Sequence, residues 1–268
     1  PGAVATVTGG TLFGGDTLTG GTFAFVSKNV GNNVTVNVSG VSVSDGNGGA
    51  NYTLTQAPNN TSSITPASLN VTGVTATSRT YNGSTGVALG GTAAVAALGT
   101  DAVSVAGAGT GVFADKNVGT AKPVTVSGFT LAGTDAGNYN IVQPTGLTAN
   151  VTTAPLVISG VTAANTTYNG TTVAPLAGTA SVTPFLTDIV TVSGTGDGSF
   201  ANKNAGTSKA VTVSGFTLTG ADAANYTPVQ PTGLTANVAQ ANIGVSGLSA
   251  VNRTYDATNV VALSGTAA

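Results

Sequence analysis

The same eight residues, Val-Thr-Val-Ser-Gly-Phe-Thr-Leu, occupy positions 124–131 and 211–218 of the chain. Apolar and polar residues alternate on both sides of the Ser-Gly pair, but the parity of this alternation changes at Gly128 and at Gly215. Because successive side chains point to opposite faces of a strand, the change predicts a β-bulge or a sharp bend, which glycine permits. A related stretch surrounds Ser39-Gly40. The pattern therefore predicts β-structure that bends once in each copy.

The distance between the two identical stretches, 87 residues, recurs along the chain. Tyr81, Tyr168 and Tyr255 keep this spacing. A fixed period of this length indicates tandem structural units. We therefore divide the chain into a partial copy at 1–66, complete copies at 67–153 and 154–240, and the opening of another copy at 241–268, and we expect it to be part of a longer array.

Short runs rich in Val, Thr, Leu and Phe alternate with turn sequences such as Asn169-Gly170. The chain shows no helical periodicity and lacks Glu and Met, two good helix formers. Six or seven short strands in 87 residues predict an all-β chain of tandem immunoglobulin-like β-sandwiches. In the copy at 154–240 the strand candidates besides the repeated stretch are Leu156–Thr162, Val173–Thr179, Ile189–Ser193, Tyr226–Gln230 and Leu234–Val238.

The composition excludes several classes of function. The chain has no Cys and no His, which excludes disulfides, thiol catalysis, Cys/His zinc sites and imidazole bases. A net charge of −2 with 7 basic residues gives no basic patch for nucleic acid, and no apolar run has the length of a membrane span. We therefore expect no enzyme, no catalytic, cofactor-binding or metal-binding residues, no nucleic acid partner and no membrane insertion.

Some arrangements offer weaker chemical alternatives. A Ser–Lys pair at Lys122 or Lys209 is the alternative for catalysis, but no strained nucleophile turn accompanies either lysine. The loop at 45–49 offers one carboxylate and one amide, fewer oxygens than calcium needs. Asp135 and Asp222 each precede an Asn by three residues, a spacing that favours Asx turns. A glycine-rich stretch at 14–21 is similar to a calcium-binding β-roll repeat but occurs once, where a loop is expected.

The six tyrosines fall in two columns of the repeat. A buried Tyr ring needs a partner for its hydroxyl, so we expect these residues to anchor loops to the sandwich rather than to stack on sugars. The columns are Tyr52, Tyr139 and Tyr226, and Tyr81, Tyr168 and Tyr255.

Lys116 and Lys203 each precede an Asn-x-Gly turn. We expect solvated turns with an occasional salt bridge to Asp101 or Asp188, worth about 0–1 kcal/mol. The alternative is an intramolecular Lys–Asn isopeptide crosslink, which requires a buried lysine and a nearby carboxylate.

Five blocks recur in order and at fixed spacing. They are Tyr81-Asn82-Gly83, Lys116-Asn117-Val118-Gly119, the segments 124–128 and 135–139, and the segment 143–149. They resemble the tandem YDG-type repeats of large bacterial exoproteins, although Asn stands for Asp after Tyr81 and Tyr168, and Ala257 stands for Gly. Such repeats occur in filamentous-haemagglutinin-like adhesins of two-partner secretion systems. The resemblance implies an extracellular or cell-surface location and brings no catalytic residues.

We expect the array to be a structural stalk or fibre segment of a secreted bacterial surface adhesin or extracellular matrix filament. Sandwiches in series supply length and unfold one at a time under load, and unpaired strand edges favour association with other copies of the chain. The alternative is a carbohydrate-binding repeat array that contacts host or matrix glycans. An ice-binding solenoid is disfavoured by the long period, and frequent Asn-x-Ser/Thr triplets leave glycosylation open.

Overall fold

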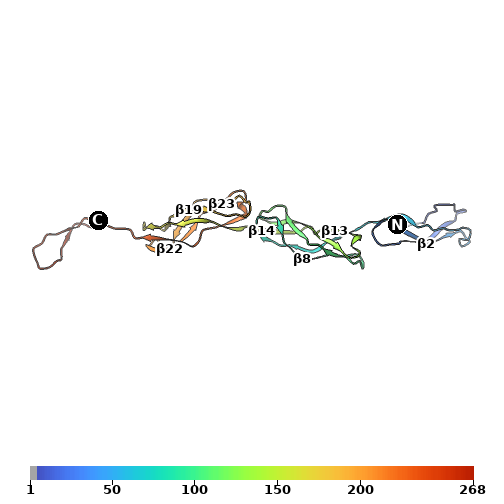
Figure 1. Cartoon of the computed structure of the whole chain (residues 1–268), viewed down its shortest axis with the longest axis horizontal. Helices are drawn as coiled ribbons and strands as arrows, with labels where there is room; N and C mark the ends of the chain where they lie inside the picture. Colours follow the sequence, from blue (N-terminus) through green and yellow to red (C-terminus); the bar gives the residue numbers. More distant parts are fainter. Residues whose placement is uncertain (1–4) are drawn as a thin grey trace. The chain divides into compact units, whose positions relative to one another are not determined.

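The computed structural model describes residues 5–268, which form short strands joined by turns (Figure 1). Two single-turn 3-10 segments, η1 (Ala136–Asn138) and η2 (Ala223–Asn225), are the helical elements of the described chain, and neither has the length or apolar character to cross a bilayer. The chain packs as two compact units. Unit 1 comprises residues up to 79, 85–115 and 119–150, and unit 2 comprises 80–84, 116–118 and 151–268.

Residues 17–64 of the partial copy form one antiparallel sheet in unit 1, in the order β1-β2-β3. Gly40 lies inside β2 with a φ of 69°, and Val41 and Val43 are buried beyond it. The strand therefore continues through the predicted bend and keeps its apolar residues on the core side. The bounds are β1 (Thr17–Phe25), β2 (Gly31–Ser44) and β3 (Asn59–Ile64).

The copy at 67–153 contains a five-stranded sheet in the order β6-β14-β11-β10-β7. Three two-stranded ladders complete it: β5 with β8 and β9 with β12 are antiparallel, and β4 with β13 is parallel. The bounds are β4 (Ala67–Asn70), β5 (Thr72–Ala76), β6 (Arg79–Thr80), β7 (Gly86–Val87), β8 (Leu89–Ala94), β9 (Ser104–Ala106), β10 (Thr110–Phe113), β11 (Gly119–Ser127), β12 (Thr130–Ala132), β13 (Tyr139–Val142) and β14 (Thr148–Thr152).

The copy at 154–240, in unit 2, repeats this topology with the sheet order β17-β25-β22-β21-β18. Its bounds are β15 (Ala154–Val157), β16 (Ser159–Ala163), β17 (Thr166–Thr167), β18 (Val173–Ala174), β19 (Leu176–Ser181), β20 (Thr191–Ser193), β21 (Asp197–Phe200), β22 (Gly206–Ser214), β23 (Thr217–Thr219), β24 (Tyr226–Val229) and β25 (Leu234–Ala239). The last residues form one short hairpin of β26 (Ser249–Ala250) and β27 (Leu263–Ser264), and their side chains are exposed.

The core of unit 2 lies on one face of the five-stranded sheet. Its buried members come from β18, β21, β22 and β25, which supply alternate residues as the period-2 pattern requires. They are Ala174, Phe200, Val211, Val213, Ala236 and Val238. The predicted all-β class with tandem β-sandwich repeats is therefore confirmed.

The ladder between β16 and β19 is irregular at two glycines whose backbones lie in close contact, and its register shifts between Ser159 and Val161. Gly178 in β19 has a φ of 89°, and a Cβ added to it would lie 2.2 Å from the carbonyl oxygen of Gly160. The predicted strand Leu156–Thr162 is divided at Ile158 between β15, which pairs with β24, and β16, which pairs with β19. The short strands β17 and β21 were not predicted, because two residues or a glycine-rich stretch give too little alternation.

The predicted bends at Gly128 and Gly215 are confirmed. Both glycines have positive φ values, 93° and 88°, and in each copy one strand ends before the bend and another begins after it. Gln143 fixes the first bend, because its side-chain amide donates to the carbonyl of Phe129 at 2.8 Å and accepts from the N–H of Phe129 at 3.2 Å. Gln230 bonds to Phe216 in the same way.

Candidate functional site

Five charged and aromatic side chains form a cluster in unit 2. They are Tyr81, Lys116, Asp188, Asp222 and Tyr226, which we call the lysine–aspartate cluster of unit 2. The loops at 80–84 and 116–118 come from the copy at 67–153, whereas the aspartates belong to the copy at 154–240. The cluster therefore joins loops of one copy to the copy that follows.

The carboxylate of Asp188 lies at the centre of the cluster, with its side chain 1% exposed. Its Oδ2 accepts hydrogen bonds from the hydroxyls of Tyr81 at 2.6 Å and Tyr226 at 2.7 Å. Its Oδ1 accepts from Nζ of Lys116. A buried carboxylate needs such partners, because an unpaired charge away from water is strongly destabilising.

Asp222 supplies a second carboxylate to the same lysine. Its Oδ1 lies 2.9 Å from Nζ of Lys116, and its Oδ2 accepts the N–H of Ile189 at 2.9 Å. The predicted Asx turn is therefore wrong: the side chain does not cap η2, and the turn is closed by the backbone bond from Asn225 N to Asp222 O. Asp135 differs from the prediction in the same way, because its Oδ2 accepts the N–H of Ala102.

Three aromatic rings pack against one another in the cluster. The rings of Tyr81 and Tyr226 meet edge to face at 5.3 Å, and Phe185 lies 6.2 Å and 5.9 Å from them. The N–H of Phe185 donates to the hydroxyl of Tyr226 at 2.8 Å. The tyrosine column at Tyr226 thus ties the loop before Asp188 to the sandwich, as predicted.

The electrostatics of the cluster favour the charged pair. Burial raises the pKa of Asp188, but the hydrogen bonds from Lys116, Tyr81 and Tyr226 outweigh it, and the pKa of this carboxyl is lowered overall. The hydrogen bonds to Asp188 and Asp222 raise the pKa of Lys116. Burial, together with the neighbouring carboxylate, raises the pKa of Tyr81 and of Tyr226 to about 12. Both tyrosines therefore stay protonated and donate.

A second, uncharged contact holds the loop at 116–118. Asn225 is 4% exposed; its Oδ1 accepts the N–H of Val118 at 2.9 Å, and its Nδ2 donates to Oδ1 of Asn117 at 3.1 Å. The loop is thus bound at its lysine and at its backbone.

Unit 1 contains an equivalent cluster of Lys28, Asp101, Asp135 and Tyr139. Lys28 of the first copy pairs with Asp101 and lies 3.4 Å from Asp135, and the hydroxyl of Tyr139 donates to Oδ2 of Asp101 at 2.8 Å. The side chain of Lys28 is 64% exposed, against 30% for Lys116, so the cluster of unit 1 is the more solvated. Asn138 also accepts the N–H of Val30, as Asn225 accepts that of Val118.

The second tyrosine column shows what the following copy contributes. Tyr81 is 1% exposed beside Asp188 and Phe185, whereas Tyr168, one period later, is 36% exposed. The turns themselves match: Asn82 Oδ1 accepts the N–H of Ser84 and Asn169 Oδ1 that of Thr171, both at 3.1 Å. The difference in burial therefore arises from the packing of the next copy.

The lysines are placed differently from several sequence predictions. The turn at Lys116 is not simply solvated, because two carboxylates lie at its Nζ. The side chain of Asn225 bonds to Val118 and Asn117 instead, which disfavours the Lys–Asn crosslink. The predicted salt bridge to Asp188 is present. Lys203 is exposed. Lys122 pairs with Asp115 at 2.6 Å and Lys209 bonds to Asn202 at 2.9 Å, so neither supports a Ser–Lys nucleophile.

The loop at 45–49 uses its carboxylate for its own backbone. Oδ1 of Asp45 accepts the N–H groups of Asn47 at 2.9 Å and Gly49 at 2.8 Å, and these bonds lower the pKa of Asp45. Within residues 5–268 no three His, Cys, Asp or Glu side chains gather in a way that would hold a metal ion.

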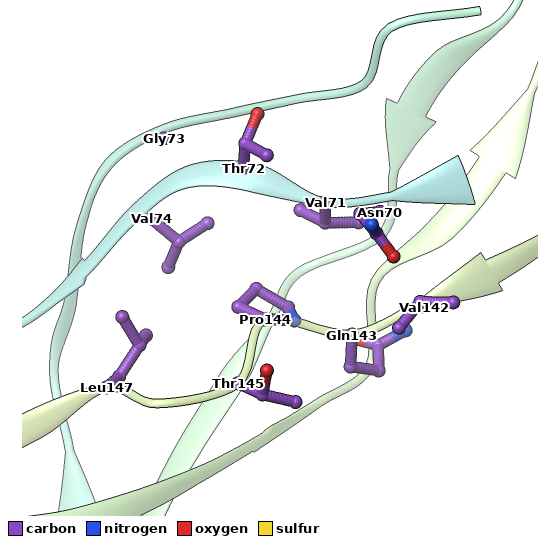
Figure 2. A pocket seen from close by; sticks show the side chains of 10 residues that line it. All are labelled: Asn70, Val71, Thr72, Gly73, Val74, Val142, Gln143, Pro144, Thr145 and Leu147. Atoms are coloured by element: carbon purple, nitrogen blue, oxygen red, sulfur yellow. The ribbon is translucent and has the colours of Figure 1, made fainter. Parts of the chain in front are cut away.

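A groove of about 350 Å³ lies in unit 1. One wall is the segment that runs from the end of β4 into β5, and the other is the connection from β13 to β14. Figure 2 shows Pro144 and Leu147 on one side, with Val71 and Val74 across from them. Its lining contains no aromatic ring, and the amide of Gln143 is bonded to Phe129. The groove therefore lacks the stacking surface that sugar binding uses.

The repeat structure agrees with the comparison with protein families. The model of the YDG domain matches residues 2–61, 65–146 and 152–233. The chain belongs to the YDG-domain family. Each YDG domain after the first receives a lysine loop from the one before it. In the third turn of the tyrosine column Asp256 Oδ1 accepts the N–H of Thr258 at 3.0 Å, as the asparagines do in the other two turns. Asn and Asp are thus equivalent at this position of the YDG signature. No curated protein and no solved structure matches the chain.

Proposed function

We propose that this chain is a structural segment of a secreted bacterial surface adhesin or extracellular matrix filament, and that it acts mechanically as a stalk. The carrying observation is that the lysine–aspartate cluster occurs in both units, each time between consecutive YDG domains. Every middle domain both supplies a lysine loop and receives one. A connection of this kind transmits tension along an array without a ligand or a catalytic group.

The buried part of the connection in unit 2 supports this role. Asp188 and Asn225 are both buried in the third domain, and each is bonded to a loop of the second. Removing one partner of such a buried pair costs about 3–5 kcal/mol, so the contact resists separation more strongly than an exposed salt bridge.

Single-molecule pulling on the two ends of the full chain tests the mechanical role. The two complete domains are expected to unfold in separate events, each releasing about 310 Å of extended chain less the folded length, from 87 residues at ~3.6 Å each. Lys116→Ala is expected to lower the force of one event, whereas the matched control Lys203→Ala, at an exposed lysine, leaves it unchanged. Smooth extension without discrete events would contradict the proposal.

Surface location and self-association require separate measurements. Immunogold electron microscopy of producing cells is expected to label material outside the cell envelope, and label confined to the cell interior would contradict secretion. Sedimentation of the chain at increasing concentration tests association with other copies through exposed strand edges. A monomer at every concentration would limit the function to that of a single-chain stalk.

A further inference from the structure

The lysine–aspartate cluster of unit 2 contains each group that amide formation requires. From this geometry we propose that Lys116 and Asp188 form an intramolecular isopeptide bond, with Asp222 as the proton carrier and the hydroxyls of Tyr81 and Tyr226 as the oxyanion site. The inference concerns the site on which the proposed function rests, and it adds a covalent modification that the mechanical role does not need.

The nucleophile and the electrophile are held together. Nζ of Lys116 is bonded to Oδ1 of Asp188, and the buried carboxylate also accepts from two tyrosine hydroxyls. Fixing two reacting groups in contact replaces a bimolecular encounter, with effective molarities of about 10⁵–10⁸ M. Exclusion of water from the carboxylate also disfavours the reverse hydrolysis.

The two oxygens of Asp188 have different surroundings, which defines the direction of the reaction. When Nζ attacks Cγ, negative charge develops on Oδ2, which faces the hydroxyls of Tyr81 and Tyr226 at 2.6 Å and 2.7 Å. Donors at this distance from a developing oxyanion are the arrangement that stabilises a tetrahedral intermediate. Oδ1, on the side of the lysine, is left as the departing oxygen.

Asp222 lies where the protons must move. One proton of the Lys116 ammonium passes to Oδ1 of Asp188, which gives a neutral amine and a neutral carboxyl. After attack, Asp222 at 2.9 Å accepts a second proton from Nζ and delivers it to the leaving hydroxyl. The Nζ–Cγ bond forms, the Cγ–Oδ1 bond breaks, and one water leaves with no oxidation or reduction. Because the charged pair is favoured, the neutral pair is a minor species and the reaction is slower than folding.

The cluster of unit 1 serves as an internal comparison. Within the described part of unit 1, Asp101 accepts from one tyrosine hydroxyl, Lys28 is 64% exposed, and Asp135 lies 3.4 Å from Nζ rather than 2.9 Å. A more solvated amine with a weaker oxyanion site is expected to remain an ion pair. The full chain is therefore expected to lose one water, at Lys116 and Asp188.

Mass spectrometry of the full folded chain, after prolonged incubation at neutral pH, tests the proposal. The intact mass is expected to be lower than that of the sequence by one water. Trypsin is expected to release the segment 80–203 as a single peptide lacking one water, because a linked Lys116 resists cleavage and Lys122 precedes a proline. The unlinked chain would instead yield 80–116 and 117–203.

Variants assign the chemistry. Lys116→Arg and Asp222→Asn are each expected to retain the full mass. Tyr81→Phe combined with Tyr226→Phe is expected to slow the loss of water at least tenfold, whereas the control Lys203→Arg is expected to leave that rate unchanged. Circular dichroism checks that each variant is folded. An unmodified mass of the wild-type chain overturns the proposal. So does a water loss that persists in Lys116→Arg or maps to the Asp-Gly pairs at 45–46 or 197–198, where cyclisation to a succinimide also removes water.

Pulling provides a second readout that separates this proposal from the mechanical one. A bond between residues 72 positions apart shortens the fully extended chain by about 260 Å. Discrete unfolding events that reach the full extended length would agree with the mechanical function and would overturn the proposal of an isopeptide bond.

Discussion

Removing one hydroxyl, in Tyr81→Phe, tests the junction between consecutive YDG domains. The substitution keeps the ring that packs on Tyr226 and removes a 2.6 Å hydrogen bond to Asp188. A hydrogen bond to a charged group contributes about 1.5–3 kcal/mol. The hydroxyl of Tyr226 still donates to the same oxygen, so the carboxylate is not left unpaired and we expect the lower part of this range, about 2 kcal/mol. Tyr168→Phe, at the equivalent but 36% exposed position, is expected to change stability by less than about 0.5 kcal/mol.

Amide hydrogen exchange resolves this effect locally. Tyr81→Phe and Tyr168→Phe are each made in a Lys116→Arg background, in which a guanidinium keeps the charge but forms no amide with Asp188. The segment 183–190 contains the N–H groups of Phe185 and Asp188, which are bonded in the loop beside the cluster. A loss of about 2 kcal/mol is expected to accelerate its exchange about 30-fold in Tyr81→Phe. Equal exchange in the two variants would refute the view that the following domain, rather than the turn itself, holds the tyrosine.

Three further outcomes follow from the same structure. The hydrogen bond from Lys28, with that from Tyr139, lowers the pKa of Asp101, so the unfolded chain binds the extra proton in acid. The stability that this pair contributes is full above the ordinary pKa of 3.8 and is lost as the pH falls through the folded-state pKa. Asp101→Asn is therefore expected to reduce the loss of thermal stability between about pH 7 and pH 2. Phe200→Ala opens a cavity in the core of unit 2 and is expected to cost about 3–5 kcal/mol in urea unfolding, whereas an unchanged midpoint would contradict its burial at 4% exposure. Gly178→Ala places a methyl 2.2 Å from an opposing carbonyl oxygen and is expected to lower the melting temperature more than Gly170→Ala, which has a similar φ but no atom within 4 Å.

The sequence predicts the fold well because the signals are local. Alternation along Val211 and Val213, and its change of parity at Gly215, reflect the two faces of a strand and the conformational freedom of one glycine. The irregular pairing of β16 with β19 is harder to predict, because the carbonyl oxygen that Gly178 meets belongs to Gly160, on a different strand. The hydrogen bonds between the side chain of Gln230 and the backbone of Phe216 were not predicted for the same reason, because the two residues meet only in the folded chain.

The cluster is only partly visible in the sequence. The recurrence of scarce charges at fixed positions predicts a salt bridge from Lys116 or Lys203 to Asp101 or Asp188, but it does not predict that Lys116 pairs with the aspartate of the following copy. The roles of Asp222 and Tyr81 were not predicted, because these side chains come from different copies and meet only after the domains have folded. The spacing of Asp222 and Asn225 suggested a local turn, but the carboxylate instead bonds to Lys116 and to the N–H of Ile189.

The lysine loop and its acceptor aspartates lie on successive copies, so each copy presents a lysine to the next copy and a pair of aspartates to the copy before it. Deleting or duplicating any whole multiple of 87 residues leaves each lysine loop next to a matching pair of aspartates. A deletion out of this register would strand a buried carboxylate. An array built in this way can be lengthened or shortened by whole copies while every contact at its junctions stays the same.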